Sequence, residues 1–217
     1  MIYSPGRGYL FIHVPKTGGT SLALALEAKA QAGDIMAGDT PKATKRRGRL
    51  KGLPAKGRLW KHSTLSDLEG WLDREFERLY IFTLVRNPWD RVVSYYHWLR
   101  LQSFDHPAVT LAKAHDFAGF LEQAHTRAAL SRSPYGSYVS DARGREHCAR
   151  FVRLEHLDAD IPALSADLGI KLDMPHVNRS ERPGDYREAY DSRTQALVAE
   201  FCAADIARFG YQFDAGD

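Results

Sequence analysis

The chain has 217 residues, of which 44% are hydrophobic and 26% are charged, and its formal net charge at pH 7 is +3. This composition excludes a wholly disordered chain, and the length suits one globular domain, which we expect to span residues 1–217. Cys148 and Cys202 show no metal-binding or redox spacing, and a single possible pair makes no disulfide framework, so we expect two buried thiols in a reducing compartment.

The first predicted element is a buried strand over residues 9–14 (YLFIHV). A short run that is apolar on both faces is typical of a central parallel strand. The run is too brief for a signal peptide or a membrane span, so we expect a cytoplasmic protein without a membrane partner. After Pro15 the chain turns, and an alanine- and leucine-rich stretch predicts a helix over residues 20–30.

The turn between this strand and this helix has the composition of an anion-binding loop. Two adjacent glycines let the backbone curl so that successive N–H groups point inward, and the helix adds the positive end of its dipole. A Walker A sequence is absent, because the lysine precedes the glycines. An ordinary strand-to-helix turn is the alternative. The residues expected to bind phosphate or sulfate oxygens are Lys16, Thr17, Gly18, Gly19, Thr20 and Ser21.

Positive charge is concentrated in residues 42–61, which contain nine basic side chains and no acidic one. The remaining residues have more acidic than basic side chains, so this segment supplies the positive field. It is either a solvated, mobile loop or a surface that recruits an anionic partner. We also expect a short strand over residues 58–61 and a helix over residues 66–74, with His62 between them.

A second buried strand is predicted over residues 79–85 (LYIFTLV), and it ends at Arg86. Asn87 is placed to cap the next helix, with Pro88 at its first position. Arg86 emerges at the carboxyl end of the strand, where a guanidinium can grip a phosphate with two parallel hydrogen bonds. Ser94, two helical turns further on, can offer its hydroxyl to the same group, although a solvated serine explains it equally well.

The rest of the chain is predicted to be mainly helical. The final helix is expected over residues 187–208, closed by a glycine cap at Gly210. Alternating strands and helices favour a three-layer α/β fold with a central parallel sheet. Ligands of such sheets gather at the carboxyl ends of the strands. We therefore expect the loop after Pro15, Arg86 and His62 to surround one crevice.

Two segments of the sequence, taken together, resemble a known family of enzymes. HVPKTGGTSL near the start and LVRNPWDRVVSYY further on resemble the two donor-binding signatures of sulfotransferases that use PAPS (3′-phosphoadenosine 5′-phosphosulfate). The chain is most similar to the group that contains heparan sulfate 2-O-sulfotransferase and related carbohydrate sulfotransferases. The resemblance is strong in residues 9–30 and 79–99, and weaker similarity over residues 151–157, 176–180 and 205–211 extends it to the C-terminus.

The resemblance implies a sulfotransferase with the P-loop-like α/β fold that nucleotide kinases share. The residues from Lys16 to Ser21 would hold the 5′-phosphosulfate of PAPS. Arg86 and Ser94 would hold the 3′-phosphate that distinguishes PAPS from ATP, and would therefore also bind the product, PAP.

The resemblance also concerns the acceptor and the end of the chain. In relatives a basic loop closes over the donor, which points here to Arg179, Ser180 and Arg182; a surface turn is the alternative. The acceptor would be a hydroxyl group, which we expect on a carbohydrate and, because of the basic segment, in an anionic saccharide such as an acidic sugar chain. No metal is implied.

Sulfuryl transfer by in-line displacement leaves two tasks to side chains. Charge grows on the oxygen between phosphorus and sulfur, and Lys16 is the cation placed to stabilise it. The acceptor hydroxyl must lose a proton, which a neutral histidine accepts near pH 7. His62 is our choice for this base, since relatives have a His-Gly-His sequence near this point, of which only the last histidine is matched here, after Trp60 and Lys61. His97, on the helix after the second strand, is the second candidate.

Two other functions are compatible with these patterns. A small-molecule kinase would share the fold and the phosphate loop, but the missing Walker A sequence and the pairing of Arg86 with Ser94 argue against it. A non-catalytic polyanion-binding protein would depend on the basic segment, but the charge is confined to one loop and no nucleic-acid recognition motif is present. We therefore expect no nucleic-acid partner.

Overall fold

The computed structural model describes residues 1–175 and 184–214. The chain forms two compact units. Among the described residues, the first unit comprises residues 1–85 and 135–175, and the second comprises residues 86–134 and 184–214. That the whole chain is one domain stays a prediction.

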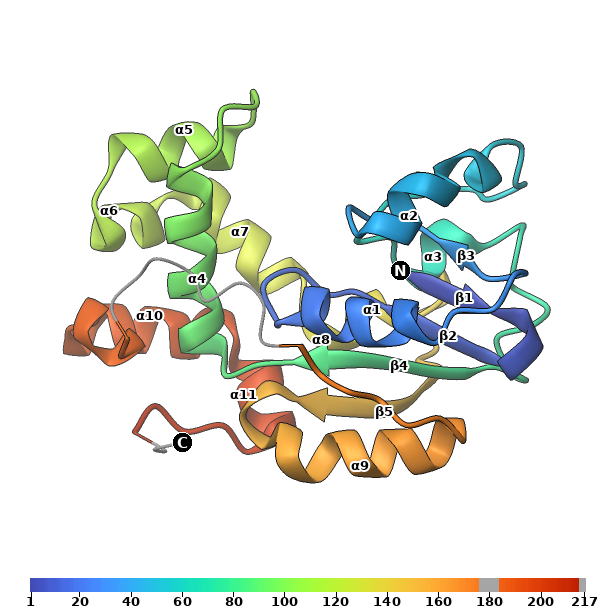
Figure 1. Ribbon diagram of the computed structural model, residues 1–217. Coiled ribbons are helices and arrows are strands. Elements are labelled where there is room, and N and C mark those ends of the chain that lie inside the picture. The colour runs from blue at the N-terminus through green and yellow to red at the C-terminus, as the bar shows by residue number, and fades with distance from the viewer. Residues whose placement is uncertain (176–183, 215–217) are drawn as a thin grey trace. The chain divides into compact units, whose positions relative to one another are not determined.

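The first unit is built on a five-stranded mixed sheet (Figure 1). Its strands, in the order in which they lie side by side, are β3 (Ile35–Met36), β1 (Ile2–Ser4), β2 (Tyr9–Ile12), β4 (Tyr80–Val85) and β5 (Cys148–Arg153). β2, β4 and β5 are parallel neighbours, whereas β1 runs antiparallel to both β2 and β3. The two strands predicted from apolar runs are confirmed as β2 and β4, and the predicted α/β fold with parallel central strands is confirmed with them.

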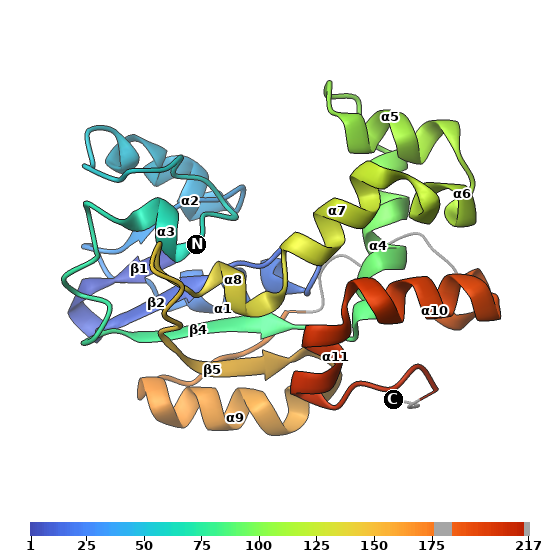
Figure 2. The same ribbon diagram turned by 180° about the vertical axis from the view of Figure 1, so that it is seen from behind.

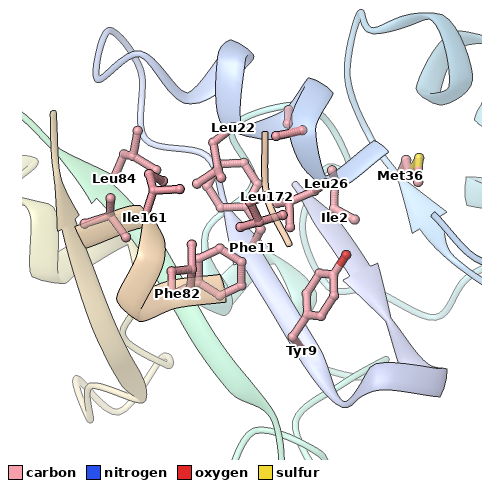
Figure 3. Close-up of a cluster of buried hydrophobic side chains, with 14 of the residues drawn as sticks. Ile2, Tyr9, Phe11, Leu22, Leu26, Met36, Phe82, Leu84, Ile161 and Leu172 are labelled. Atoms are coloured by element: carbon pink, nitrogen blue, oxygen red, sulfur yellow. The ribbon is translucent and has the colours of Figure 1, made fainter. Parts of the chain in front are cut away.

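One face of this sheet packs against α1 (Gly19–Ala28) and α9 (Leu157–Leu168). Successive side chains of a strand point to opposite faces, so Tyr9 and Phe11 of β2 lie on the same face. Figure 3 shows these rings in one cluster with Phe82 of β4, Leu22 of α1 and Ile161 of α9. Full burial of each such side chain stabilises the fold by about 1.5–3 kcal/mol, which fixes both helices on the sheet.

The other face is covered by α3 (Leu65–Leu68), by α8 (Tyr135–Tyr138) and by the loops around them (Figure 2). Leu10 and Ile12 of β2 point to this face. Helices on both faces of the sheet make the three predicted layers. Because the sheet is covered on both sides, its central strands β2 and β4 are mainly apolar and contain no charged residue.

The second unit contains helices and no strand among its described residues. Asn87 caps the first helix by accepting the N–H of Trp89 at 3.1 Å, and Pro88 is its first residue, as predicted. The apolar side of this helix, including Tyr96, packs with Phe120 and other residues in a core separate from that of the sheet. The helices are α4 (Pro88–Arg100), α5 (Pro107–Ala114), α6 (Phe117–Glu122), α7 (Ala124–Arg132), η4 (Tyr186–Ala189), α10 (Ser192–Phe201) and α11 (Ala203–Phe209).

Two predicted elements around His62 are wrong. Residues 58–61 form no strand. The Ser63 hydroxyl donates to the Arg58 carbonyl at 2.9 Å, and this hydrogen bond stabilises a turn before His62. The helix expected over residues 66–74 is limited to α3, since Gly70 with a φ of 83° turns the chain shortly after it.

The long C-terminal helix predicted over residues 187–208 is divided into η4, α10 and α11. Asp191 accepts the N–H of Thr194 at 2.7 Å and so caps a new helix after η4. Gly210 closes α11 in the left-handed conformation with a φ of 67°, as predicted.

Two expectations from composition concern the thiols and the membrane. Cys202 is buried as predicted, whereas Cys148, at the start of the edge strand β5, is only partly buried, and both are free thiols. Within residues 1–175 and 184–214, no helix has the length and the apolar character that crossing a bilayer requires. The cytoplasmic location stays a prediction.

Candidate functional site

The loop between β2 and α1 has an unusual backbone. Lys16 has a φ of 66° and Gly18 has a φ of 80°, so both residues are in the left-handed region. Glycine adopts this region freely, whereas an L side chain there costs about 1–2 kcal/mol. Among the described residues, Lys16 is the one non-glycine residue with a positive φ. Because such strain is concentrated at binding sites, this loop is the first candidate for the site.

Close packing explains both glycines of the loop. A Cβ atom at Gly19 would lie 2.4 Å from Cδ2 of His13, and one at Gly18 would lie 2.7 Å from Cδ1 of Leu154. His13 is 4% exposed, so its ring has little room to move away from the start of α1. Gly19 therefore lets α1 begin close to the end of β2, and Gly18 lets the loop pass close to Leu154, the residue after β5.

The hydroxyl residues of the loop have different roles. Thr17 is buried, and its hydroxyl donates a hydrogen bond of 2.9 Å to the carbonyl of Val14. Since its proton is committed to closing the loop, the Thr17 hydroxyl has none to donate to an anion. Thr20 and Ser21 are half-buried in the first turn of α1, and the N-cap residue of this helix, Gly18, has no side chain that could cap it. The first N–H groups of a helix need partners outside it, and an anion can supply them.

His62 lies against the same end of β2. Its Nδ1 is 2.7 Å from the carbonyl oxygen of His13, and the centroids of the two imidazole rings are 4.8 Å apart, edge to face. A carbonyl oxygen only accepts, so Nδ1 is the protonated nitrogen of the neutral ring. Nε2 then has the free lone pair, which is the state that a general base requires.

Burial keeps both histidine rings in the neutral form. Burial, with a smaller contribution from the positive charge of Lys61, lowers the pKa of His62 to about 4. Burial also lowers the pKa of His13 well below its usual range. Both rings are therefore neutral near pH 7, and His62 keeps its base form there.

The free energy of unfolding should fall as the pH is lowered from about 6.5 toward about 4. In this window the unfolded chain binds protons at His13 and His62 that the folded protein does not bind, so acid favours the unfolded chain. Each such histidine contributes a slope of about 1.4 kcal/mol per pH unit, which urea unfolding at a series of pH values measures. His62→Gln should reduce the slope, and the same change at the exposed His125 is the control. If the free energy of unfolding of His62→Gln depended on pH as steeply as that of the wild type, the lowered pKa of His62 would not be its cause.

A tight turn presents His62. The N–H of Trp60 donates to the Ser63 hydroxyl at 2.8 Å, and Ser63 is buried. Trp60 packs edge-on against His62, with ring centroids 5.1 Å apart, and is 42% exposed. Sequence reasoning did not identify Trp60 as a site residue, although a tryptophan in so polar a segment is itself a signal, because large apolar side chains are normally buried.

In the second unit, Arg86 is the first residue after β4 and is only 8% exposed. Its Nε and Nη2 atoms are 2.7 and 2.5 Å from Oδ2 of Asp90, across the first turn of α4. This pairing orients the guanidinium, whose planar fork has five N–H donors. Sequence reasoning did not identify Asp90 as the partner of Arg86.

Two other predicted residues lie further along α4. Ser94 is 4% exposed, and its hydroxyl makes no hydrogen bond to another described residue. His97, the second candidate for the base, is half-buried, with its ring centroid 5.4 Å from that of Tyr96.

Arg179, Ser180 and Arg182 lie outside the described residues. Their role stays a prediction.

The carboxyl ends of β2 and β4 lie side by side. The two strands are parallel, with Ile12 opposite Thr83, whose hydroxyl donates to the Ile12 carbonyl at 2.7 Å. The loop with Lys16 leaves β2 at this edge of the sheet, and the chain leaves β4 toward Arg86 at the same edge. The structure thus brings the loop and His62 together in the first unit, while Arg86 and Ser94 belong to the second unit.

Comparison with known proteins defines the class of the fold first. The structure is similar to the crystal structure of mouse sulfotransferase SULT7A1 complexed with PAP, with a TM-score of 0.54 and 18% sequence identity over 92% of this chain and 85% of that chain. At this identity the likeness shows a shared fold. A search of curated proteins found no match.

The family follows from the sequence model that the chain matches. A model described as the sulfotransferase family matches residues 1–212, which is nearly the whole chain. The chain belongs to the sulfotransferase family. Enzymes of this family take the sulfuryl group from PAPS, so the protein is a PAPS-dependent sulfotransferase.

Proposed function

We propose that the loop from Lys16 to Ser21 holds the 5′-phosphosulfate of PAPS. One observation carries this proposal: the left-handed residues Lys16 and Gly18 lead directly into the N-terminus of α1, where the N-cap residue is a glycine and offers no side chain of its own. This geometry suits oxygen anions, because curled backbone offers successive N–H groups and the helix dipole adds positive potential. Gly19 and Thr20 contribute N–H groups in this arrangement, and Thr17 contributes its N–H but not its hydroxyl.

The 3′-phosphate of the donor is assigned to Arg86 and Ser94. The parallel pairing of β2 with β4 supports this assignment, because the two strands end at the same edge of the sheet. The guanidinium of Arg86 is oriented by Asp90, and fork-like donors match phosphate oxygens. The Ser94 hydroxyl, without a hydrogen-bond partner among the described residues, supplies a further donor.

The reaction then needs a cation and a base. PAPS supplies the sulfuryl group, which passes to the acceptor oxygen as PAP leaves. Lys16 stabilises the negative charge that grows on the phosphate oxygen when its bond to sulfur breaks. Nε2 of His62 accepts the proton of the acceptor hydroxyl as the new sulfur–oxygen bond forms, and Nδ1–H keeps its bond to the His13 carbonyl. The negative charge of the bound donor raises the pKa of His62 and so strengthens this base.

We assign the acceptor hydroxyl to a carbohydrate, and more narrowly to an anionic saccharide. Trp60 supports the carbohydrate, because its exposed indole offers a flat apolar surface beside His62. The basic segment of residues 42–61 supports the anionic character, because it concentrates positive charge on the stretch of chain that leads to His62.

Sulfate transfer from labelled PAPS to a panel of acceptors tests this function. The panel should include neutral and acidic saccharides, lipids, phenols and peptides. We expect transfer to saccharides, with the acidic ones preferred. Transfer to phenols or lipids alone would contradict the acceptor assignment, and no transfer at all by protein that binds PAP would contradict the catalytic role.

Replacing Arg86 with alanine should weaken PAP binding by at least about tenfold, since a charged hydrogen bond contributes about 1.5–3 kcal/mol. Binding of adenosine 5′-phosphate, which has no 3′-phosphate, should change much less. Calorimetric titration of both nucleotides into both proteins measures the difference. An equal loss for the two nucleotides would show that Arg86 serves the fold or the 5′-phosphate, and not the 3′-phosphate.

A further inference from the structure

Four basic side chains line a groove of about 430 Å³ on α2 (Pro41–Arg46) and η2 (Arg47–Leu50). This volume lies in the range of about 300–1,000 Å³ that is typical of small-ligand sites. Part of the basic segment is therefore a folded, concave surface. The residues that line the groove are Lys42, Lys45, Arg46, Gly48 and Arg49.

The side chains that line this groove form no ion pairs among the described residues. Later in the same segment, Lys56 pairs with Glu69 and Lys61 pairs with Asp39, both at 2.8 Å. By contrast, none of the four groove cations forms an ion pair with any carboxylate of the described residues. Four like charges around one concavity, without a counter-ion, produce a positive potential that attracts an anion.

A buried carboxylate anchors the first helix of the groove. Glu27 of α1 is 5% exposed, and its two carboxylate oxygens accept the N–H groups of Lys42 at 2.9 Å and of Ala43 at 3.1 Å. Its Oε2 also accepts the hydroxyl of Thr40 at 2.5 Å. These bonds satisfy the N-terminus of α2 and hold it on the body of the first unit.

Main-chain carbonyls position the two guanidinium groups. Nη1 of Arg46 donates to the carbonyl of Gln31 at 2.8 Å, and Nη1 of Arg49 donates to the carbonyl of Ala32 at 2.5 Å. A carbonyl fixes the direction of a guanidinium without cancelling its charge. The two guanidinium groups of the groove are therefore in place before a ligand arrives, which lowers the entropy lost on binding.

We infer that this groove binds the carboxylate or sulfate groups of the saccharide acceptor, away from the hydroxyl that receives the sulfuryl group. The inference rests on the proposed function, and it assigns a binding site to one part of the basic segment. Arginine forks match carboxylates and sulfates, and several such contacts add up along a chain-like ligand. Asp39 lies two residues before α2 and pairs with Lys61, the neighbour of His62. This ion pair connects the segment that forms the groove with the turn that contains His62.

A pair of charge reversals in the same segment tests the inference. Lys45 lines the groove and Arg47 does not, and both side chains are exposed. Lys45→Glu should weaken binding of a fluorescent heparin-derived hexasaccharide by about tenfold in low salt, whereas Arg47→Glu should change it by less than about threefold. Gly48→Trp is an independent variant, because a Cβ at Gly48 meets open space and the new side chain fills the groove without changing its charge. It should weaken binding as Lys45→Glu does.

The outcomes separate the groove from the donor site. PAP affinity, measured by calorimetry on the same proteins, should stay within about twofold of the wild type, because no groove residue is assigned to the donor. Equal losses of hexasaccharide affinity in Lys45→Glu and Arg47→Glu, or unchanged binding by Gly48→Trp, would contradict a binding site in the groove. Such a result would mean that the positive charge of the whole segment attracts the ligand. A single-stranded oligonucleotide of equal charge that binds more tightly than the hexasaccharide would overturn the saccharide assignment. Absence of PAP binding in the wild type would contradict the proposed function and leave the hexasaccharide result standing.

Discussion

Replacing Lys16 with alanine should lower turnover by about 10²–10³-fold and should also weaken PAP binding. In the proposed mechanism the ammonium group of Lys16 stabilises the leaving oxygen, and no other side chain from Pro15 to Ser21 is positively charged. The loss should be greater in turnover than in binding, because the charge on the leaving oxygen is largest in the transition state. Single-turnover kinetics with PAPS and calorimetry with PAP measure the two effects separately.

The backbone of Lys16 provides a control that separates function from stability. Its φ of 66° is strained for lysine but not for glycine. Lys16→Gly should therefore raise the free energy of unfolding by about 1 kcal/mol while it abolishes activity as Lys16→Ala does. A Lys16→Gly variant that is both less stable and inactive would indicate a structural role for the lysine and contradict the catalytic one.

Replacing His62 with glutamine should lower turnover by about 10²-fold or more and leave PAP binding nearly unchanged. Because Nδ1–H donates to the His13 carbonyl, Nε2 has the free lone pair of the neutral ring and is the atom of His62 that acts as the base in the proposed mechanism. Because the pKa of the free ring is about 4, kcat/KM should stay nearly constant from pH 8 down to about pH 5 and fall below that.

His97→Gln is the matched comparison for the base. Both histidines are half-buried, and the two were the sequence candidates for this role. Turnover should be nearly normal in His97→Gln. A large loss in this variant, together with normal turnover in His62→Gln, would assign the base to His97.

The strands and loop near the start of the chain are predictable because their sequence and environment agree. β2 and β4 are buried on both faces, so neither contains a charged residue, and the turn after Pro15 contains the glycines that its packing requires. Lys16 was predictable as a cation of the loop but its left-handed backbone was not, because no local pattern marks a strained lysine.

The edge strand β5 was not predictable from its pattern. It contains Arg150 and Arg153, and charged residues at these positions are typical of an exposed loop or helix. In the structure Arg150 pairs with Asp167 at 2.7 Å and Arg153 pairs with Asp160 at 3.3 Å. These partners lie on α9, which follows β5 in the chain, so tertiary contacts decide the strand and not its own periodicity.

The environment of His62 also depends on contacts that are distant in the sequence. The segment before it was predicted as a strand from its short apolar pattern, but the Ser63 hydroxyl closes it into a turn. The bond to the His13 carbonyl joins residues 49 positions apart. The resemblance to the His-Gly-His sequence of relatives therefore indicated His62 as a candidate. The tautomer of His62 and its lowered pKa depend on contacts that only the fold provides.

The most direct measurement of the donor site is a titration of the ¹⁵N-labelled protein with PAP, without magnesium, followed by NMR. We expect the largest amide shifts at Gly18, Gly19 and Thr20, with a shift of the Arg86 Nε–H signal in the same titration. PAP binding that leaves these signals unchanged and moves others would contradict the proposed donor site.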